Sequence, residues 1–250
     1  MFGGAAQTDF DLRFPCFGVP VRVHPVFWLS AVFLCWQGAV RGGQTRPDLL
    51  ILGVLVVFIS VLVHEMGHAV VLRLFGFPSE IVLYFFGGYA TATRKSTWKD
   101  IASLIAGPAA GFVLYGLTVV FDHFVLSAGK LNGLEFIWRE RIAHVVEFSL
   151  FANLAWNVLN LIPVIPLDGG QICRELCLWF SPRKGMKWAV MVGLAVSGLI
   201  TLYGISCIQS GRPMFGRVEP RLPSFFFGYM CFQNYQIFKH LQSGARSNWR

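Results

Sequence analysis

The chain has 250 residues, of which 55% are hydrophobic and only 14% are charged, and its mean hydropathy is +0.57. These values exclude an ordinary soluble domain and predict an integral membrane protein. The net charge of +8 does not indicate a nucleic-acid partner, because Lys and Arg are spread through the short segments between apolar runs, where they would face lipid headgroups. We therefore expect the lipid bilayer, and no nucleic acid, as a partner.

The first 22 residues do not resemble a cleavable signal peptide, because Asp9, Asp11 and Arg13 precede any apolar run. If this end of the chain is cytoplasmic, more Lys and Arg lie in the inside segments than in the outside ones. The positive-inside rule therefore favours this orientation. It would place His64 nearer the cytoplasmic face of the second apolar segment.

Six apolar segments follow one another along the chain, and the first and last are the weakest candidates for membrane spans. The first is short for a span of about 20 residues, and the last contains Gln233, Asn234 and Gln236. We predict an all-α integral membrane protein, a polytopic helical bundle of five or six spans. The segments are residues 26–40, 49–72, 101–126, 142–165, 186–208 and 223–238.

The second apolar segment contains an H-E-x-x-H pattern made of His64, Glu65 and His68. On a helix, this spacing places two imidazoles on one face with the carboxylate beside them, which is the layout of a hydrolytic zinc site. Ionisable side chains are costly at membrane depth and therefore indicate a function. The structural alternative is a hydrogen-bonded polar cluster between helices.

Residues 81–93 are too short to cross a membrane and are rich in strand formers around a glycine pair. We predict a small re-entrant β-hairpin with its turn at Gly87 and Gly88. Because lipid-exposed strand edges are not viable, the hairpin must be buried in protein or border a wet cavity, where its edge could bind another extended chain. Gly87 and Gly88 are therefore candidate substrate-binding residues, and a membrane-surface loop with aromatic anchors is an equally good interpretation.

The fourth apolar segment ends in residues 160–170, which read N-L-I-P-V-I-P-L-D-G-G. Pro163 and Pro166 oppose a continuous helix, so we predict that the helix breaks there and presents Asp168 from an irregular turn. A broken helix at membrane depth is tolerated where it lines a cavity. Two His and one carboxylate, with a fourth position for water, form a catalytic zinc set, so Asp168 is the expected third ligand. The alternative is that Asp168 caps a helix.

The H-E-x-x-H pattern in one span and the N-x-x-P-x-x-P-L-D-G-G pattern in a later one together resemble the site-2 protease family of intramembrane zinc metalloproteases. Ala106, Gly107 and Pro108 also resemble a family element, and the predicted hairpin matches a segment that family members place beside the active site. One departure is Gly111, because the family often has Asn shortly after the Gly-Pro pair. The loops hold no PDZ or CBS domain, so the chain resembles the compact, sporulation-factor-processing type.

The resemblance implies one zinc ion per chain, held by His64, His68 and Asp168. Glu65 would be the general base that takes a proton from the attacking water. Asn160 would donate a hydrogen bond to the developing oxyanion or hold the substrate backbone, and the alternative is interhelical hydrogen bonding. For Asn153 and Asn157, which share its approximate helix face, packing is the favoured interpretation.

We therefore expect an intramembrane zinc endopeptidase that cuts in or near the transmembrane segment of a membrane-spanning protein substrate. The resemblance alone implies release of a regulatory domain, a regulatory membrane protein as a further partner, and a bacterial or archaeal cell membrane. The expected parts are an N-terminal segment with the first span at 1–48, a three-helix catalytic core at 49–170, and C-terminal spans with the tail at 171–250.

Two other functions stay open, and the oligomeric state is not indicated. A membrane zinc transporter or channel would repeat ionisable residues along a path through several helices. An inactive family relative acting as a membrane scaffold would have lost a ligand or the base.

Overall fold

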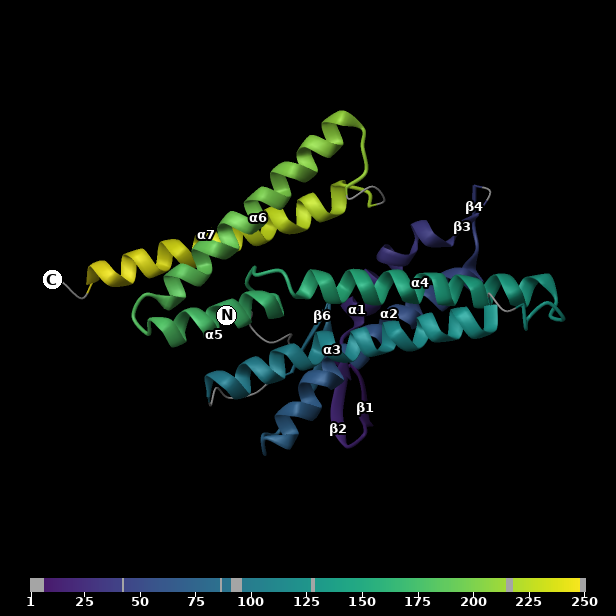
Figure 1. Ribbon diagram of the computed structural model, residues 1–250, viewed down its shortest axis with the longest axis horizontal. Helices are drawn as coiled ribbons and strands as arrows, with labels where there is room; N and C mark the ends of the chain where they lie inside the picture. The colour runs from purple at the N-terminus through teal and green to yellow at the C-terminus, as the bar shows by residue number, and fades with distance from the viewer. Residues whose placement is uncertain are drawn as a thin grey trace. The chain divides into compact units, whose positions relative to one another are not determined.

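The computed structural model describes residues 7–41, 43–85, 87–90, 96–126, 129–214 and 218–247. They belong to two compact units. The first unit comprises Met1–Lys95 and Ile105–Val158, and the second comprises Ser96–Leu104 and Leu159–Arg250. Figure 1 shows the chain as a ribbon coloured from purple at the N-terminus to yellow at the C-terminus.

Helices dominate the described chain, as the sequence predicts. The helices are α1 (Pro25–Cys35), α2 (Pro47–Leu74), α3 (Thr97–Phe121), α4 (Phe136–Asn160), α5 (Asp168–Phe180), α6 (Gly185–Ser210) and α7 (Arg221–Ser247). A 3-10 turn follows α1 at Gln37–Ala39, and a π turn extends α3 at Asp122–Leu126. The strands are β1 (Leu12–Cys16), β2 (Val19–Val23), β3 (Val40–Arg41), β4 (Gln44–Thr45), β5 (Ile81–Tyr84) and β6 (Gly87–Ala90).

Four helices of the described chain are long and apolar enough to cross a membrane: α2, α3 with its π turn, α4 and α6. The first predicted segment forms α1, a shorter apolar helix, and the last forms α7. The four long helices expose large apolar side chains such as Ile59, Leu117 and Leu199. An exposed apolar surface of this extent is suited to lipid, so the protein is an integral membrane protein.

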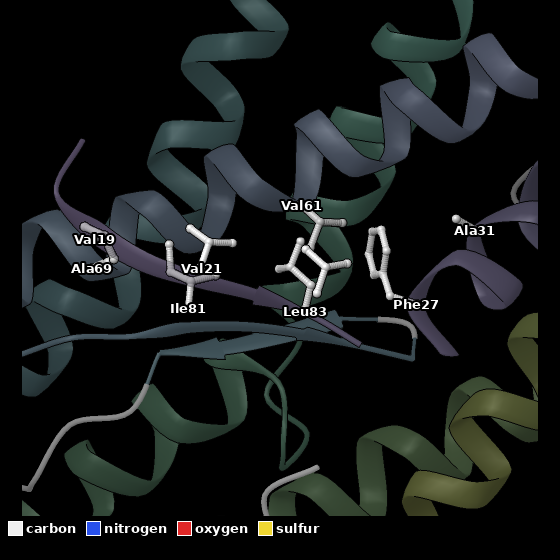
Figure 2. Packing of buried hydrophobic residues seen from close by; sticks show 9 residues of the cluster. Val19, Val21, Phe27, Ala31, Val61, Ala69, Ile81 and Leu83 are labelled. Carbon is white, nitrogen blue, oxygen red and sulfur yellow. The ribbon is translucent and has the colours of Figure 1, made fainter. Parts of the chain in front are cut away.

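In the first unit, a four-stranded sheet has the order β1-β2-β5-β6. Strand β2 is antiparallel to β1 and parallel to β5, and β5 is antiparallel to β6. Val19, Val21 and Val23 alternate along β2 and are all buried. With Ile81 and Leu83 of β5, they form an apolar cluster that also includes residues of α1 and α2, as Figure 2 shows; the cluster is Val19, Val21, Val23, Phe27, Ala31, Val61, Ala69, Ile81 and Leu83.

The predicted hairpin is present as β5 and β6, but the position predicted for its turn was wrong. Strand β5 ends at Tyr84 and β6 already begins at Gly87, and Tyr84 pairs with Gly87. Gly87 and Gly88 are therefore strand residues, and the chain reverses before them, where Phe85 has a φ of 47°. Residues 86 and 91–93 of the predicted segment lie outside the described residues.

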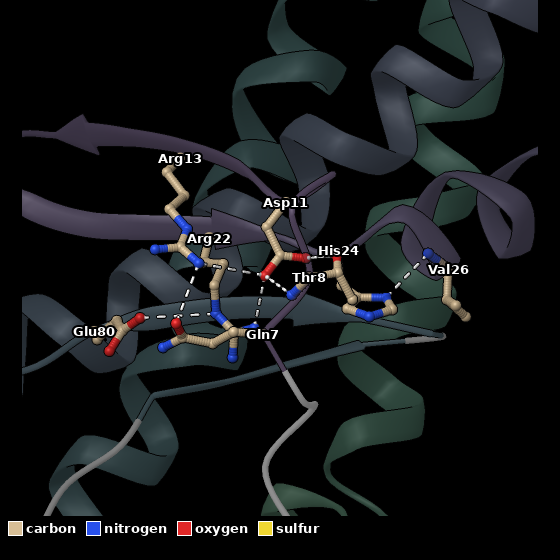
Figure 3. Close-up of polar contacts among 8 residues, drawn as sticks. All are labelled: Gln7, Thr8, Asp11, Arg13, Arg22, His24, Val26 and Glu80. Atoms are coloured by element: carbon tan, nitrogen blue, oxygen red, sulfur yellow. Dashed lines mark hydrogen bonds and ion pairs between the residues drawn. The ribbon is translucent and has the colours of Figure 1, made fainter.

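A buried ion pair joins the first two strands to the start of the chain (Figure 3). Arg22 of β2 donates to Asp11 at 3.0 Å, and the Thr8 hydroxyl donates to the same carboxyl group at 2.7 Å. The hydrogen bond from Thr8, followed by that from Arg22, lowers the pKa of Asp11 to about 2. Asp11 is therefore ionised in the folded protein at neutral pH.

Helices α2 and α4 are joined near their N-terminal ends by charged side chains. Arg46, just before α2, donates to Asp48 at 2.8 Å and to Glu140 of α4 at 3.0 Å. Arg141 of α4 donates to Asp48 at 2.9 Å. Charged groups of this kind belong at the membrane boundary, so this cluster marks one end of the helix pair.

Helix α3 also packs closely on α2, and small residues allow the approach. A Cβ added at Gly67 would lie 2.3 Å from the backbone oxygen of Ala106. Interfaces between membrane helices use glycine in this way, because it lets two backbones come together. The second, third and fourth helices therefore form a packed group in the first unit.

In the second unit, α5, α6 and α7 surround the stretch between α4 and α5. Val164 is buried in an apolar cluster with Phe227 and Met230 of α7. Asn234 of α7 is fully buried and donates its amide to the Ile165 carbonyl at 2.7 Å. Asn234, one of the polar residues that made the last segment a weak candidate for a span, therefore pairs with a backbone carbonyl that the broken helix leaves without a helical donor.

Candidate metal centre

Helix α2 holds the H-E-x-x-H pattern in a buried environment. The helix begins with Pro47 at its first turn and runs for 28 residues, and the pattern lies in its second half. His64, Glu65 and His68 are all buried. Because the sequence carries no other charge between Asp48 and Glu65, the three side chains form a single polar site on an apolar helix.

The two histidines point one ring nitrogen at each other. The Nε2 atoms of His64 and His68 are 3.2 Å apart. Zinc–nitrogen bonds of about 2.0–2.1 Å in a tetrahedral site place two ligand nitrogens roughly 3.3 Å apart. The observed separation therefore fits two imidazoles that share one zinc ion.

Gly107 of α3 leaves space for the ring of His68. A Cβ added at Gly107 would lie 2.2 Å from Nε2 of His68, so any side chain at this position would occupy the space of the ring. Gly107 belongs to the Ala-Gly-Pro element of the sequence, and its contact with the His68 ring explains why this position has no side chain.

Asp168 is the first residue of α5 and is buried. Leu167 is the N-cap residue of this helix. Asp168 therefore does not occupy the N-cap position, which was the alternative to its role as a metal ligand. His64, His68 and Asp168 are all buried, and each side chain offers one atom that could be a metal ligand.

The glycine pair that follows Asp168 is required by the local packing of the second unit. A Cβ at Gly169 would lie 2.1 Å from the Leu161 carbonyl oxygen, and one at Gly170 would lie 2.3 Å from the Val164 backbone. The first turn of α5 therefore folds directly against the residues between α4 and α5. Asp168 is presented from the start of a helix instead of from the irregular turn that the sequence predicts.

The remaining candidate site residues are Asn160, Gly87 and Gly88. Asn160 is the last residue of α4 and is buried where the helix breaks. Gly87 and Gly88 lie in β6, the last strand in the order of the described sheet. An edge strand has backbone groups that can pair with another extended chain.

Sequence reasoning missed one polar neighbour of the histidines. Asn157 of α4 lies with its Oδ1 3.0 Å from Nδ1 of His64. Its helical spacing from Asn160 drew attention to it, but only the tertiary structure reveals that its partner is a candidate metal ligand.

A polytopic helical membrane protein with two buried histidines that face each other through Nε2, and a buried Asp168 as a further candidate ligand, is typical of the membrane metalloproteins. The model of peptidase family M50 matches residues 52–200. The chain belongs to this family, as the motif pair predicted.

Named relatives agree with the family. Over 201 residues the chain is 29% identical to a zinc metalloprotease of Methanocaldococcus jannaschii, covering 79% of this chain and 55% of that protein. It is 26% identical over 181 residues to stage IV sporulation protein FB of Bacillus subtilis, covering 71% of this chain and 53% of that protein. The chain thus spans about half the length of the curated relatives it matches.

A solved structure has the same fold. The site-2 protease from Methanocaldococcus jannaschii aligns with a TM-score of 0.56 at 22% sequence identity, over 92% of this chain and 95% of that one. The helical membrane fold predicted from the sequence is confirmed by this similarity.

Proposed function

We propose that the protein is an intramembrane zinc endopeptidase that hydrolyses a peptide bond in or near the transmembrane segment of a protein substrate. The observation that carries the proposal is the pair of buried histidines His64 and His68, whose Nε2 atoms lie 3.2 Å apart, with Glu65 buried on the same helix. Membership of a peptidase family supports the reaction class.

In this proposal, His64, His68 and Asp168 hold the zinc ion. Bound zinc supplies Lewis acidity toward water and toward the scissile carbonyl. Glu65 accepts the proton of the attacking water on a carboxylate oxygen and returns it to the leaving amine nitrogen. Asn160 donates its amide N–H to the carbonyl oxygen as negative charge develops there, an interaction that can contribute roughly 3 kcal/mol.

The substrate in this proposal binds as an extended segment. An intact helix in hydrocarbon keeps its backbone groups paired and offers no accessible carbonyl to water, so the substrate must unwind locally. The backbone of β6 at Gly87 and Gly88 would pair with the unwound segment and compensate its lost hydrogen bonds. Release of a regulatory domain on the cytoplasmic side, in a bacterial or archaeal membrane, follows from the family resemblance alone.

The test is purification of the full chain in detergent, followed by metal analysis and incubation with single-span protein substrates. We expect about one zinc per chain in the wild type and in Glu65→Gln, and cleavage by the wild type only. Cleavage at the wild-type rate in Glu65→Gln would contradict the role of the base, and a wild type that binds no zinc would overturn the metal site.

The same preparations distinguish a protease from a transporter. In liposomes, zinc flux that is unaffected by Glu65→Ala, with no cleavage of any substrate, would favour transport. The scaffold alternative is tested by the wild-type cleavage itself, because an inactive relative would bind a membrane protein without cutting it.

A further inference from the structure

The buried contact between Asn157 and His64 is not used by the reaction described above. Asn157 is 1% exposed and His64 is 2% exposed, and the Oδ1 atom of Asn157 is 3.0 Å from Nδ1 of His64. Both residues lie in the first unit. A polar contact buried this deeply fixes the state of both groups.

The orientation of the Asn157 amide follows from its second contact. Its Nδ2 donates to the backbone carbonyl of Asn153, one turn earlier in α4. A carbonyl can only accept, so the NH₂ end of the amide must face Asn153 and the oxygen end must face His64. Since this oxygen also only accepts, Nδ1 of His64 must carry the proton.

The tautomer of His64 is thereby determined. In a neutral imidazole with its proton on Nδ1, the lone pair is on Nε2. That is the atom that faces Nε2 of His68 at 3.2 Å. A histidine that binds zinc needs its lone pair at this atom, and a hydrogen bond at its other nitrogen commonly sets the tautomer and the ring orientation.

Gly111 of α3 provides the space that this contact needs. A Cβ added at Gly111 would lie 2.1 Å from Nδ2 and 2.3 Å from Oδ1 of Asn157. This is the position at which the chain departs from the family pattern, where an Asn is often found. In this chain, the space beside Gly111 of α3 is occupied by the side-chain amide of Asn157 from α4.

We propose that Asn157 is a positioning residue of the zinc site: it holds His64 in the Nδ1-protonated tautomer, and Gly111 makes room for it. The inference rests on the proposed function, because it requires His64 to be a zinc ligand. If Asn157 were only an interhelical hydrogen-bonding residue, its loss would lower stability without a specific effect on metal binding.

The experiment measures zinc affinity by chelator competition on the purified full chain. Asn157→Leu removes the acceptor at similar volume, and we expect it to weaken zinc binding by about 10- to 100-fold. Asn157→Asp keeps an oxygen acceptor toward Nδ1, so its affinity should equal or exceed that of the wild type. Gly111→Ala should weaken binding as well, because the added methyl group displaces the amide.

Two matched controls separate positioning from packing. Asn153 is equally buried and donates only within α4, to Ser149, so Asn153→Leu should change stability but not zinc affinity. Gly116 is on the same helix as Gly111 and has open space around a built Cβ, so Gly116→Ala should bind zinc like the wild type. The absorption spectrum of the Co²⁺-substituted protein, which reports ligand geometry, should change in Asn157→Leu and remain unchanged in both controls.

The outcomes distinguish the inference from the proposed function. Wild-type zinc affinity and an unchanged Co²⁺ spectrum in both Asn157→Leu and Gly111→Ala would overturn the positioning role and leave the protease proposal intact. A wild type that binds no zinc would overturn the protease proposal itself. If Asn157→Leu does not fold, Gly111→Ala still decides the question, because it disturbs the amide without removing it.

Discussion

Consecutive residues on α2 have different tasks in the proposed site. His64 and Glu65 are neighbours in sequence and are both buried, yet one is a proposed ligand and the other the proposed base. Their difference lies in chemistry: an imidazole offers a lone pair to a metal, and a carboxylate can accept and return a proton.

Replacing Glu65 by Gln should separate these tasks. Gln has nearly the same shape but cannot accept a proton, so the cleavage rate should fall by about a hundred-fold to ten-thousand-fold. Zinc content should remain at the wild-type value, because the ligands are untouched. Cleavage kinetics and metal analysis on the same preparation provide the measurement, and a parallel loss of zinc would indicate that Glu65 supports the metal instead.

At the residue scale, the sequence indicates candidate ligands but not their surroundings. The H-E-x-x-H spacing and the break around Pro163 and Pro166 are local patterns, and His64, His68 and Asp168 are all buried. The contact from Asn157 could not be predicted, because it joins residues 93 positions apart on two helices. Gly111 was visible as a departure, but its meaning depends on what lies against it.

At the scale of elements, α7 supports the short stretch that precedes Asp168. Asn234 donates to the Ile165 carbonyl, and a Cβ at Gly193 of α6 would lie 2.7 Å from the Asn234 side-chain oxygen. The amide is thus enclosed between α6, α7 and the broken segment.

Asn234→Leu should weaken the second unit. It would leave the partly buried Ile165 carbonyl without this donor, which costs about 1–3 kcal/mol. Thermal unfolding in detergent should reveal the loss as a lower midpoint. Gln233→Leu, next to it in sequence, is the matched control, since Gln233 is only partly buried and its replacement should leave the midpoint nearly unchanged. Equal midpoints for the two variants would contradict the role of Asn234.

The β1–β2 hairpin should respond to acid through Asp11. Its pKa is lowered from 3.8 to about 2 by the hydrogen bonds from Thr8 and Arg22. The ionised form is therefore favoured by folding, so its contribution is fully present above pH 4 and is lost as the pH falls toward 2.

Limited proteolysis of the amino-terminal segment between pH 5 and pH 2 would measure this effect. Wild-type protection should fall across this window, and Asp11→Asn should be less protected at pH 5 and depend less on pH. Asp9→Asn is the control, because Asp9 is exposed. Identical profiles for the wild type and Asp11→Asn would exclude the contribution.

The sheet was only partly predictable from sequence. The run 81–84 and the glycine pair indicated β5 and β6, but the parallel pairing of β2 with β5 joins segments about 60 residues apart, as Val21 opposite Ile81 illustrates. The alternation of Val19, Val21 and Val23 was the available signal for β2. The turn was misplaced because Phe85, and not a glycine, has the positive φ.

At the scale of the whole molecule, the proposed protease would take a substrate that enters as a helix and is cut as an extended chain. Unwinding costs the substrate its internal hydrogen bonds, and Pro or Gly near the cut lowers that cost because both already destabilise a helix, by about 3 and 1 kcal/mol. Substrate selection would then depend on helix stability as much as on side-chain identity.

A substrate series can test this expectation. Single-span substrates with Pro or Gly placed beside the cleavage site should be cut faster than the same substrates with Leu there. The ratio should shrink when the substrate segment is presented already unfolded in detergent. Equal cleavage across the membrane-embedded series would contradict the unwinding requirement.

The charged cluster near the N-terminal ends of α2 and α4 has a consequence for water supply. From Asp48 to His64, the helix rises 1.5 Å per residue, which amounts to roughly 24 Å of a hydrocarbon layer about 30 Å thick. If the cluster lies at one headgroup layer, the two imidazoles lie only a few ångströms beneath the other. Hydrolysis would then draw its water through a shallow opening, and the bilayer would remain sealed along most of its thickness.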